Sequence, residues 1–171
     1  MMSLMRSLAF HLREIEQESL VQQWLFDSAM PVIPSTEEEN IQRGEMAMRF
    51  VIEHRTDFPH AMYRADLGWV DFIWGTPGVI KPSGKTKGAK GVSHILEARQ
   101  RKDGHSPLSA NALALRLVQV IAKGKVIRNF NDANGDTSNK TIEWQGLEAI
   151  LVKEPSLNEW LLTGWEVTSS R

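Results

Sequence analysis

The 171-residue chain has no cysteine, only one tyrosine, and no apolar run long enough to cross a membrane. Without cysteine there are no disulfides and no thiolate metal sites, which is compatible with a reducing cytosol. A membrane-spanning helix needs about 20 consecutive apolar residues, so no membrane partner is expected. Charged residues follow soon after Leu12, which is not typical of a secretory signal peptide. The sequence therefore predicts a cytoplasmic protein.

The net charge of −1 hides an uneven distribution of charge along the chain. Residues 79–128 contain 11 Lys and Arg but only two Asp and Glu, whereas acidic residues predominate on both sides of this block. A segment this basic favours a polyanionic partner. The alternative is that basic and acidic segments neutralise each other within the folded domain.

Apolar periodicity and turn residues indicate helices first and a meander of strands last. Ser35 or Thr36 is expected to cap one helix, and two more are expected to begin at Gly91 or Ser93 and at Ser106. Extended segments are predicted over residues 62–74, from 125 onward, and over 141–144, 147–153 and 159–167. This order predicts an α+β fold with an antiparallel sheet.

The sequence contains two segments that are similar to known motifs but do not fulfil them. Gly84-Lys85-Thr86 is like the end of a phosphate-binding loop, but Val79 stands where the first glycine belongs and Pro82 removes a backbone donor. Residues 132–136 alternate as in a calcium loop, but the glycine comes two positions early. The five histidines show no spacing typical of a metal site. No metal ion and no cofactor is therefore expected.

Potentially reactive side chains are more densely grouped in residues 66–99 than elsewhere in the sequence. An apolar run stops at Gly75, and the loop from there to Gly91 holds five glycines, two prolines and four lysines. His94 follows in the first turn of the expected helix, where a phosphate is favoured. Its imidazole can exchange a proton near neutral pH. The alternative is a histidine that only hydrogen-bonds a backbone carbonyl.

The last strand offers a second group of candidates. If Trp160, Leu162 and Gly164 face one side, then Leu161, Thr163 and Trp165 face the other. The Thr163 hydroxyl could then meet a phosphate on the sheet, although threonine is also simply typical of strands. Lys153 ends the preceding strand and could lie across from this one, with a solvated strand end as the alternative.

Three segments, DLGWVDFIWG, GVSHILEAR and WLLTGWE, occur in this order and together resemble the barnase/colicin-type endoribonuclease domains of phage and mobile-element proteins. These domains belong to a superfamily that includes barnase, EndoU, the RNase colicins and RelE. The resemblance covers roughly residues 44–167. It implies N-terminal helices packed on a roughly four-stranded antiparallel sheet. It also implies metal-independent cleavage of RNA, in which the ribose 2′-hydroxyl attacks the adjacent phosphate and leaves a cyclic phosphate.

The same motifs imply roles for particular residues. His94 is expected to transfer a proton and Thr163 to orient the scissile phosphate. Arg99 matches a basic position in the helix of His94, and Lys153, added from strand order, is expected to hold the phosphate with it. The substrate-binding residues are expected to be Lys85, Lys87 and Lys90. The resemblance further implies a toxin-like or mobile-element-borne protein, bacterial or phage-delivered, with an immunity or antitoxin protein as a candidate partner.

Residues 1–40 have no counterpart in the resemblance and are predicted to form a helical extension to an endoribonuclease-like domain of residues 41–171. Two alternatives remain open. A nucleic-acid-binding or protein-interaction module could have kept the fold and lost catalysis, since no carboxylate other than Glu97 accompanies His94. A structural phage or mobile-element protein could instead dock an acidic partner on its basic block.

Overall fold

The structure is a computed structural model that describes residues 22, 31–131, 133, 138–153 and 159–168. Contacts within the chain group residues 1–32 and 33–171 into two compact units. The elements given below belong to the second unit. Most of the predicted extension, residues 1–40, lies outside the described residues, and its boundary stays a prediction.

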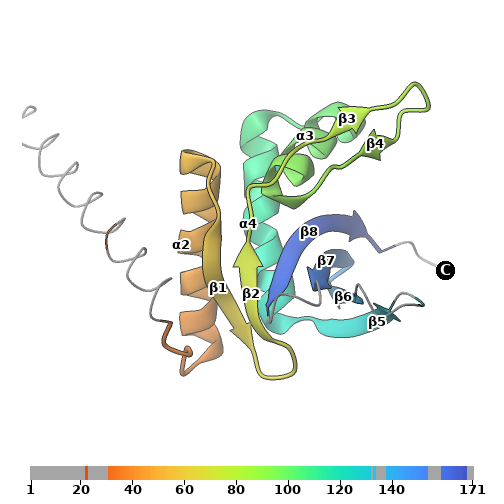
Figure 1. Ribbon diagram of the computed structural model, residues 1–171. Helices are drawn as coiled ribbons and strands as arrows, with labels where there is room; N and C mark the ends of the chain where they lie inside the picture. The colour runs from red at the N-terminus through yellow and green to blue at the C-terminus, as the bar shows by residue number, and fades with distance from the viewer. Residues whose placement is uncertain (1–21, 23–30, 132, 134–137, 154–158, 169–171) are drawn as a thin grey trace, which may run out of the picture. The chain divides into compact units, whose positions relative to one another are not determined.

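Helices and strands follow one another in the order that Figure 1 shows. They are α2 (Glu37–His54), β1 (Phe58–Arg64), β2 (Gly68–Phe72), β3 (Val79–Ile80), β4 (Thr86–Lys87), α3 (Gly91–Asp103), α4 (Pro107–Lys123), β5 (Lys125–Asn131), β6 (Ser138–Trp144), β7 (Leu147–Lys153) and β8 (Trp160–Val167).

Six of these strands form one sheet in the order β1-β2-β8-β7-β6-β5. All neighbours pair antiparallel except β2 and β8, which run parallel. The α+β fold is confirmed, but the expected number of about four strands is wrong. Residues 62–74, predicted as one extended segment, instead contain the end of β1, a turn and β2. The β1–β2 hairpin joins the rest of the sheet through the pairing of β2 with β8.

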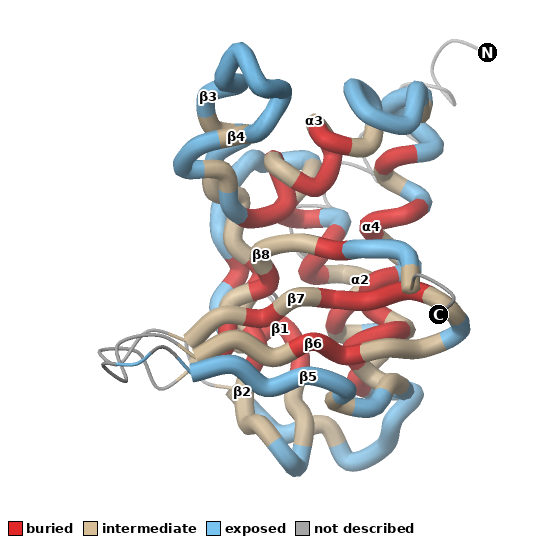
Figure 2. The backbone as a smooth tube through the Cα atoms, turned by 90° about the vertical axis from the view of Figure 1, so that its right-hand side faces the viewer, coloured by how far each residue is buried: buried red, intermediate tan, exposed pale blue. Residues whose placement is uncertain are grey.

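The helices cover one face of the sheet, and the core lies between the two layers. Helix α2 packs on β1 and α4, α4 on β6 and β7, and α3 on β8. Figure 2 shows buried backbone concentrated where these elements meet, with β5 exposed at the edge. Phe72, Leu151 and Leu162 are fully buried on the helix side. Because side chains alternate along a strand, neighbours such as Asp71 and Leu161 lie on the opposite face, where they are only partly buried.

Thr36 and Ser106, two of the residues expected to cap helices, form local hydrogen bonds at the starts of α2 and α4. The Thr36 hydroxyl accepts a bond from the Glu39 N–H at 3.1 Å, and the Ser106 hydroxyl accepts one from the Ser109 N–H at 3.1 Å. Gly104 ends α3 in the left-handed conformation, at φ 67°. Side-chain oxygens at a helix start and glycine just past its end are the usual way to satisfy such termini.

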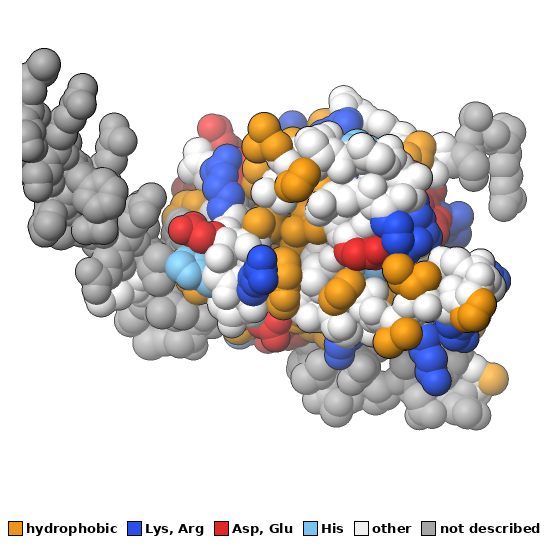
Figure 3. All heavy atoms as spheres, turned by 90° about the horizontal axis from the view of Figure 1, so that it is seen from above, with side chains coloured by type: hydrophobic (Ala, Val, Ile, Leu, Met, Phe, Trp, Pro, Cys, Tyr) orange, Lys and Arg blue, Asp and Glu red, His pale blue; other side chains and the backbone are white. Residues whose placement is uncertain are grey.

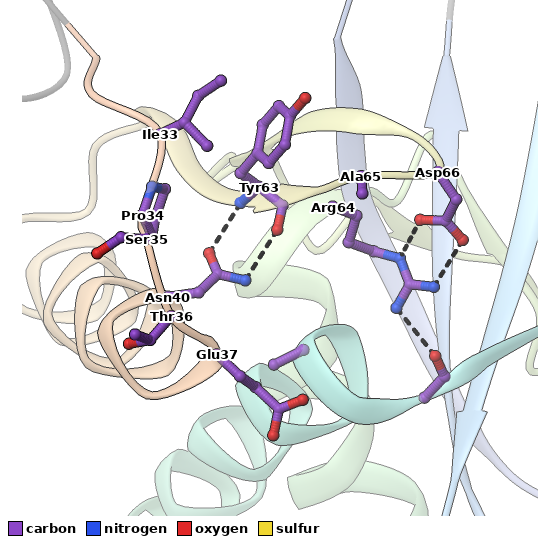
Figure 4. Close-up of a pocket in the computed structure, with 12 residues that line it drawn as sticks. Ile33, Pro34, Ser35, Thr36, Glu37, Asn40, Tyr63, Arg64, Ala65 and Asp66 are labelled. Atoms are coloured by element: carbon purple, nitrogen blue, oxygen red, sulfur yellow. Dashed lines mark hydrogen bonds and ion pairs between the residues drawn. The ribbon is translucent and has the colours of Figure 1, made fainter.

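A hollow of about 480 Å³ lies near the start of α2 and the end of β1, and its Asn40 and Arg64 side chains are held in hydrogen bonds (Figure 4). The Asn40 amide donates to the Tyr63 carbonyl at 2.8 Å and accepts from the Tyr63 N–H at 2.9 Å. The Arg64 guanidinium pairs with Asp66 at 2.8 Å and donates to the Ile121 carbonyl at 2.6 Å. This hollow is therefore a structural junction of α2, β1 and α4.

Candidate active site

Helix α3 is attached directly to the end of β2. The Val92 and Ser93 N–H groups donate to the carbonyls of Ile73 and Trp74, each at 2.9 Å. Lys90 caps the helix in an extended conformation, and its backbone forms an isolated bridge with Thr76. Phe72, the last residue of β2, pairs with Leu162, and α3 packs on β8. The start of α3, with His94, therefore lies next to the end of β2.

Strand β8 bulges at Thr163, and this overturns the predicted division of its faces. Leu162 pairs with Leu151 but Gly164 pairs with Ile150, so Thr163 is the extra residue. A bulge of this kind reverses the alternation beyond it. Trp165 consequently lies on the buried side with Leu162, not on the opposite side. The Thr163 hydroxyl donates to the Ile150 carbonyl at 3.2 Å, which ties it to the neighbouring strand.

His94 is partly buried, and its environment favours the neutral imidazole. Burial lowers the pKa of His94, and the nearby cations of Lys102, Arg99 and Arg101 lower it further, while Glu97 acts in the opposite direction. The Nδ1 atom is buried and has no hydrogen-bond partner. A neutral imidazole with a free nitrogen can accept a proton near pH 7.

Arg99 extends from the same helix toward β8. Its guanidinium lies over the ring of Trp165, 4.4 Å from the centroid, and its Nη1 pairs with Asp103 at 2.6 Å. The Nε atom of Arg99 is buried and unpaired. The aromatic ring and the carboxylate hold the guanidinium in place and leave this donor for another acceptor.

Unpaired polar atoms gather around α3 and the end of β8. Buried polar atoms normally have a hydrogen-bond partner. Among the described residues, six of the seven buried side-chain atoms without a partner belong to this region, and only Asn139 Oδ1 lies elsewhere. The six are Ser93 Oγ, His94 Nδ1, Glu97 Oε2, Arg99 Nε, Trp165 Nε1 and Thr168 Oγ1. This concentration is typical of a site whose partners come from a ligand.

The groove beside this region has a volume of about 860 Å³. Ser93, Glu97 and Arg101 of α3 line it on one side. Residues of α2 and the Trp74 ring contribute to the other side. The groove therefore exposes the Ser93, Glu97 and Arg101 side of α3, whereas His94, Arg99 and Thr163 do not line it.

The predicted lysines are spread over this end of the molecule. Lys85 precedes β4, Lys87 ends it, and Lys90 leads into α3, so all three belong to the hairpin segment that projects from the helices in Figure 1. Seen from this end, basic side chains are scattered among apolar ones and do not form one continuous field (Figure 3).

Lys153 lies apart from the other predicted site residues. Its ammonium lies 5.6 Å from the centroid of Trp160, and the Lys140 ammonium lies 5.5 Å from the same centroid. Trp160 is three residues before Thr163, a separation of about 10 Å along a strand. Lys153 shares its face of β7 with the buried Leu151. The structure thus places Arg99 against Trp165 of β8 and Lys153 against Trp160 at the other end of that strand. No contact brings His94 and Thr163 together among the described residues, and the roles of all four stay predictions.

A second titratable cluster was not found from the sequence. The His60 imidazole forms an ion pair with Glu159, and the His60 N–H donates to Asp71 Oδ1 at 2.8 Å. His60 has a left-handed backbone, at φ 52°, inside a bulge of β1. The available signal was Asp71 itself, a lone carboxylate within the apolar run of residues 69–74.

The pKa of Asp71 is raised to about 7. Burial is the largest cause, and the hydrogen bond to Glu159 adds to it, whereas the bond from the His60 backbone N–H opposes it.

Since the folded-state pKa of Asp71 lies above its unfolded value, the wild type loses stability as pH rises from about 4 to about 7. Asp71→Asn, which resembles the protonated acid, is therefore expected to melt higher than the wild type at pH 8 and equally at pH 4. Thermal unfolding at both pH values tests this, and a lower melting temperature at pH 8 would contradict it.

Two searches of the described part of the chain, for a metal-ligand cluster and for a membrane-spanning helix, found neither. There, no group of three or more His, Cys, Asp and Glu side chains is arranged to hold a metal ion. No helix there has the length and apolar character needed to cross a membrane.

Comparison with known proteins decides the family. Residues 61–171 match the model of the family described as phage-Barnase-EndoU-ColicinE5/D-RelE like nuclease. The chain belongs to this nuclease family. The match includes β2, α3 and β8, so the whole cluster around His94 lies within the nuclease domain. No curated protein and no solved structure matches the chain.

Proposed function

We propose that this member of the nuclease family is an endoribonuclease that cleaves RNA without a metal ion. The ribose 2′-hydroxyl attacks the adjacent phosphorus, a bond forms between O2′ and phosphorus, and the bond from phosphorus to O5′ breaks. The products are a 2′,3′-cyclic phosphate and a free 5′-hydroxyl. Such a reaction needs a base, an acid, and cations for the charged transition state.

One observation carries the proposal: His94 and Arg99 stand on one helix with a free Nδ1 and a free Nε among other unpaired polar atoms. The neutral imidazole of His94 takes the proton of the 2′-hydroxyl. The guanidinium of Arg99, held over Trp165, meets the oxygens of the scissile phosphate, where charge increases in the transition state. Thr163 of β8 orients that phosphate.

The hairpin lysines extend this contact along the RNA backbone. Lys85, Lys87 and Lys90 precede the α3 helix by a few residues, and lysine contacts to phosphates release counterions. Binding is therefore expected to weaken steeply with salt. The toxin-like role, the cytoplasmic RNA target and an immunity or antitoxin partner are proposed on the family resemblance alone.

The proposal is tested with mixed RNA and with a matched oligonucleotide that carries a single 2′-deoxyribose at the cleavage position. In the presence of a chelator, the wild type is expected to leave cyclic-phosphate ends and to spare the deoxy position. His94→Ala is expected to lower kcat/KM by about 10²- to 10⁴-fold, which is the usual contribution of a general base to the rate.

His105→Ala is the matched control, because His105 lies at the start of α4 with its Nδ1 2.8 Å from the Ser109 hydroxyl. It is expected to keep wild-type activity. RNA that is bound in a salt-dependent way but left intact by the wild type would favour the non-catalytic binding module. RNA that is not bound at low salt would exclude both nucleic-acid interpretations.

A further inference from the structure

The groove lined by α2, α3 and α4 contains groups that the reaction above does not use. Its volume of about 860 Å³ lies within the usual range for sites that bind a small molecule. Ile52, Pro77 and Leu96 give it apolar walls, and Trp74 and Arg55 add an aromatic ring and a cation. The groove thus combines apolar surface with a few polar groups, which is typical of a ligand site.

Two acceptors of α3 in this groove have no partner. Ser93 and Glu97 are one turn apart, so they share a face of the helix, and both line the groove. Ser93 is only 6% exposed, and neither its hydroxyl nor Oε2 of Glu97 has a hydrogen-bond partner. Arg101 pairs with Oε1 of Glu97 at 2.5 Å and so holds the carboxylate in place. Because unpaired buried acceptors are costly, a ligand that supplies donors is favoured here.

Trp74 provides a flat surface whose backbone is fixed on both sides. Its N–H donates to Asp57 Oδ1 at 2.7 Å, and its carbonyl accepts the Ser93 N–H at 2.9 Å. The Arg55 guanidinium lies 6.0 Å from the centroid of the Trp74 ring, and no carboxylate of the described residues pairs with it. An aromatic ring beside an unpaired cation fits a planar group that carries a negative charge, as a nucleotide does.

The two free acceptors discriminate between bases. The exocyclic amino group of adenine, guanine or cytosine has two N–H donors, so it can satisfy the Ser93 hydroxyl and Glu97 Oε2 together. Uracil has one ring N–H and no amino group, so it leaves one of the two acceptors unpaired. Polar sites reject an analogue for this reason, because a buried group loses its partner.

We propose that this groove binds one nucleotide of the RNA, with its base stacked on Trp74, its amino group on Ser93 and Glu97, and its phosphate on Arg55. This inference rests on the proposed function for the source of the nucleotide. A free nucleoside monophosphate has the same chemistry, and the experiment below separates the two sources.

The groove adjoins His94 without including it. Ser93 is the residue before His94, and Glu97 is one of the charges that act on the His94 imidazole. A nucleotide held in the groove therefore lies beside the helix that carries the proposed base.

Binding of the four nucleoside 5′-monophosphates to the full chain, measured by calorimetry, tests the site. AMP, GMP and CMP are expected to bind about 5- to 100-fold more tightly than UMP. Ser93→Ala is expected to weaken the first three, to leave UMP unchanged, and so to narrow this gap. Because the Ser93 hydroxyl has no partner, this variant is expected to keep the wild-type midpoint of urea unfolding.

Two further variants test the ring and the cation. Trp74→Leu is expected to weaken all four nucleotides by about 5- to 100-fold, the usual effect of removing a stacking partner, and Trp74→Phe to retain most of the affinity. Arg55→Ala is expected to weaken all four as well. Arg49→Ala is the matched control, because Arg49 is exposed on α2 and does not line the groove.

Competition identifies the source of the nucleotide. The full chain carrying His94→Ala is used, so that RNA is bound but not cleaved. Oligocytidylate is expected to displace CMP from this chain, and oligouridylate to do so only at higher concentration. If neither oligonucleotide displaces CMP, the ligand is a free nucleotide and RNA is excluded as its source.

The outcomes distinguish this inference from the function it rests on. Equal affinity for all four nucleotides, no binding of any of them, or a preference that Ser93→Ala leaves unchanged contradicts the site, whatever the wild type does to RNA. A wild type that shows the preference but cleaves no RNA contradicts the proposed function, while the nucleotide site stands.

Discussion

Replacing Arg99 with alanine is expected to lower kcat/KM for RNA by about 10²- to 10³-fold, the usual loss when one donor to a transition-state oxyanion is removed. The guanidinium lies 4.4 Å from the centroid of Trp165 and pairs with Asp103 at 2.6 Å, so it is oriented before RNA binds. A preoriented donor loses little entropy when charge develops on the phosphate. Steady-state cleavage of a short RNA measures the effect.

Arg101→Ala is the matched control for this prediction. Arg101 stands on the same helix and pairs with Glu97 one turn earlier at 2.5 Å. Its removal takes away the same charge but no donor next to Trp165, and only a few-fold loss is expected. Arg99→Lys is expected to recover part of the activity, because it restores the charge without the planar guanidinium. Equal losses in Arg99→Ala and Arg101→Ala would contradict the role of Arg99.

Gly91→Ala is expected to destabilise the domain by about 3–4 kcal/mol and to abolish RNA cleavage. Gly91 has φ 79°, and a Cβ there would lie 2.7 Å from the carbonyl oxygens of both Ile73 and Trp74. These two carbonyls accept the first hydrogen bonds of α3. Any shift that relieves the contact also displaces the helix that carries His94 and Arg99.

Gly88→Ala separates the backbone effect from the steric one. Gly88 has a similar φ of 73°, but nothing lies within 4 Å of its Cβ position. Only the left-handed conformation is then penalised, at about 1–2 kcal/mol. Urea unfolding of both variants measures the difference, and equal destabilisation would mean that α3 is not held in place by close contact at Gly91.

The termini of the helices could be predicted because their causes are local. The Thr36 and Ser106 caps and the glycine after α3 each involve residues within a few positions of one another. The turn at Gln145-Gly146 joins neighbouring strands in the same way. Likewise, the placement of His94 at the start of a helix follows from Gly91 and the polar loop before it.

The sheet was predicted less well, because its pairings are made between distant residues. Nothing near Val70 indicates a parallel partner 90 residues later, at Trp160. The bulge at Thr163 depends on how β7 aligns with β8. That alignment places Trp165 on the buried side, where it supports Arg99, and so a one-residue irregularity decides the geometry of the candidate site.

By itself, the sequence determined the α+β class, the cap residues Thr36 and Ser106, the motif order that indicates the nuclease family, and His94 and Arg99 as candidates on one helix. These depend on local hydrogen bonds, periodicity and residue identity. Only the tertiary structure decided that Arg99 lies on Trp165 and that Asp71, Glu159 and His60 meet. These arrangements need strands from opposite ends of the domain to meet, and burial in that contact is what changes the chemistry of the side chains.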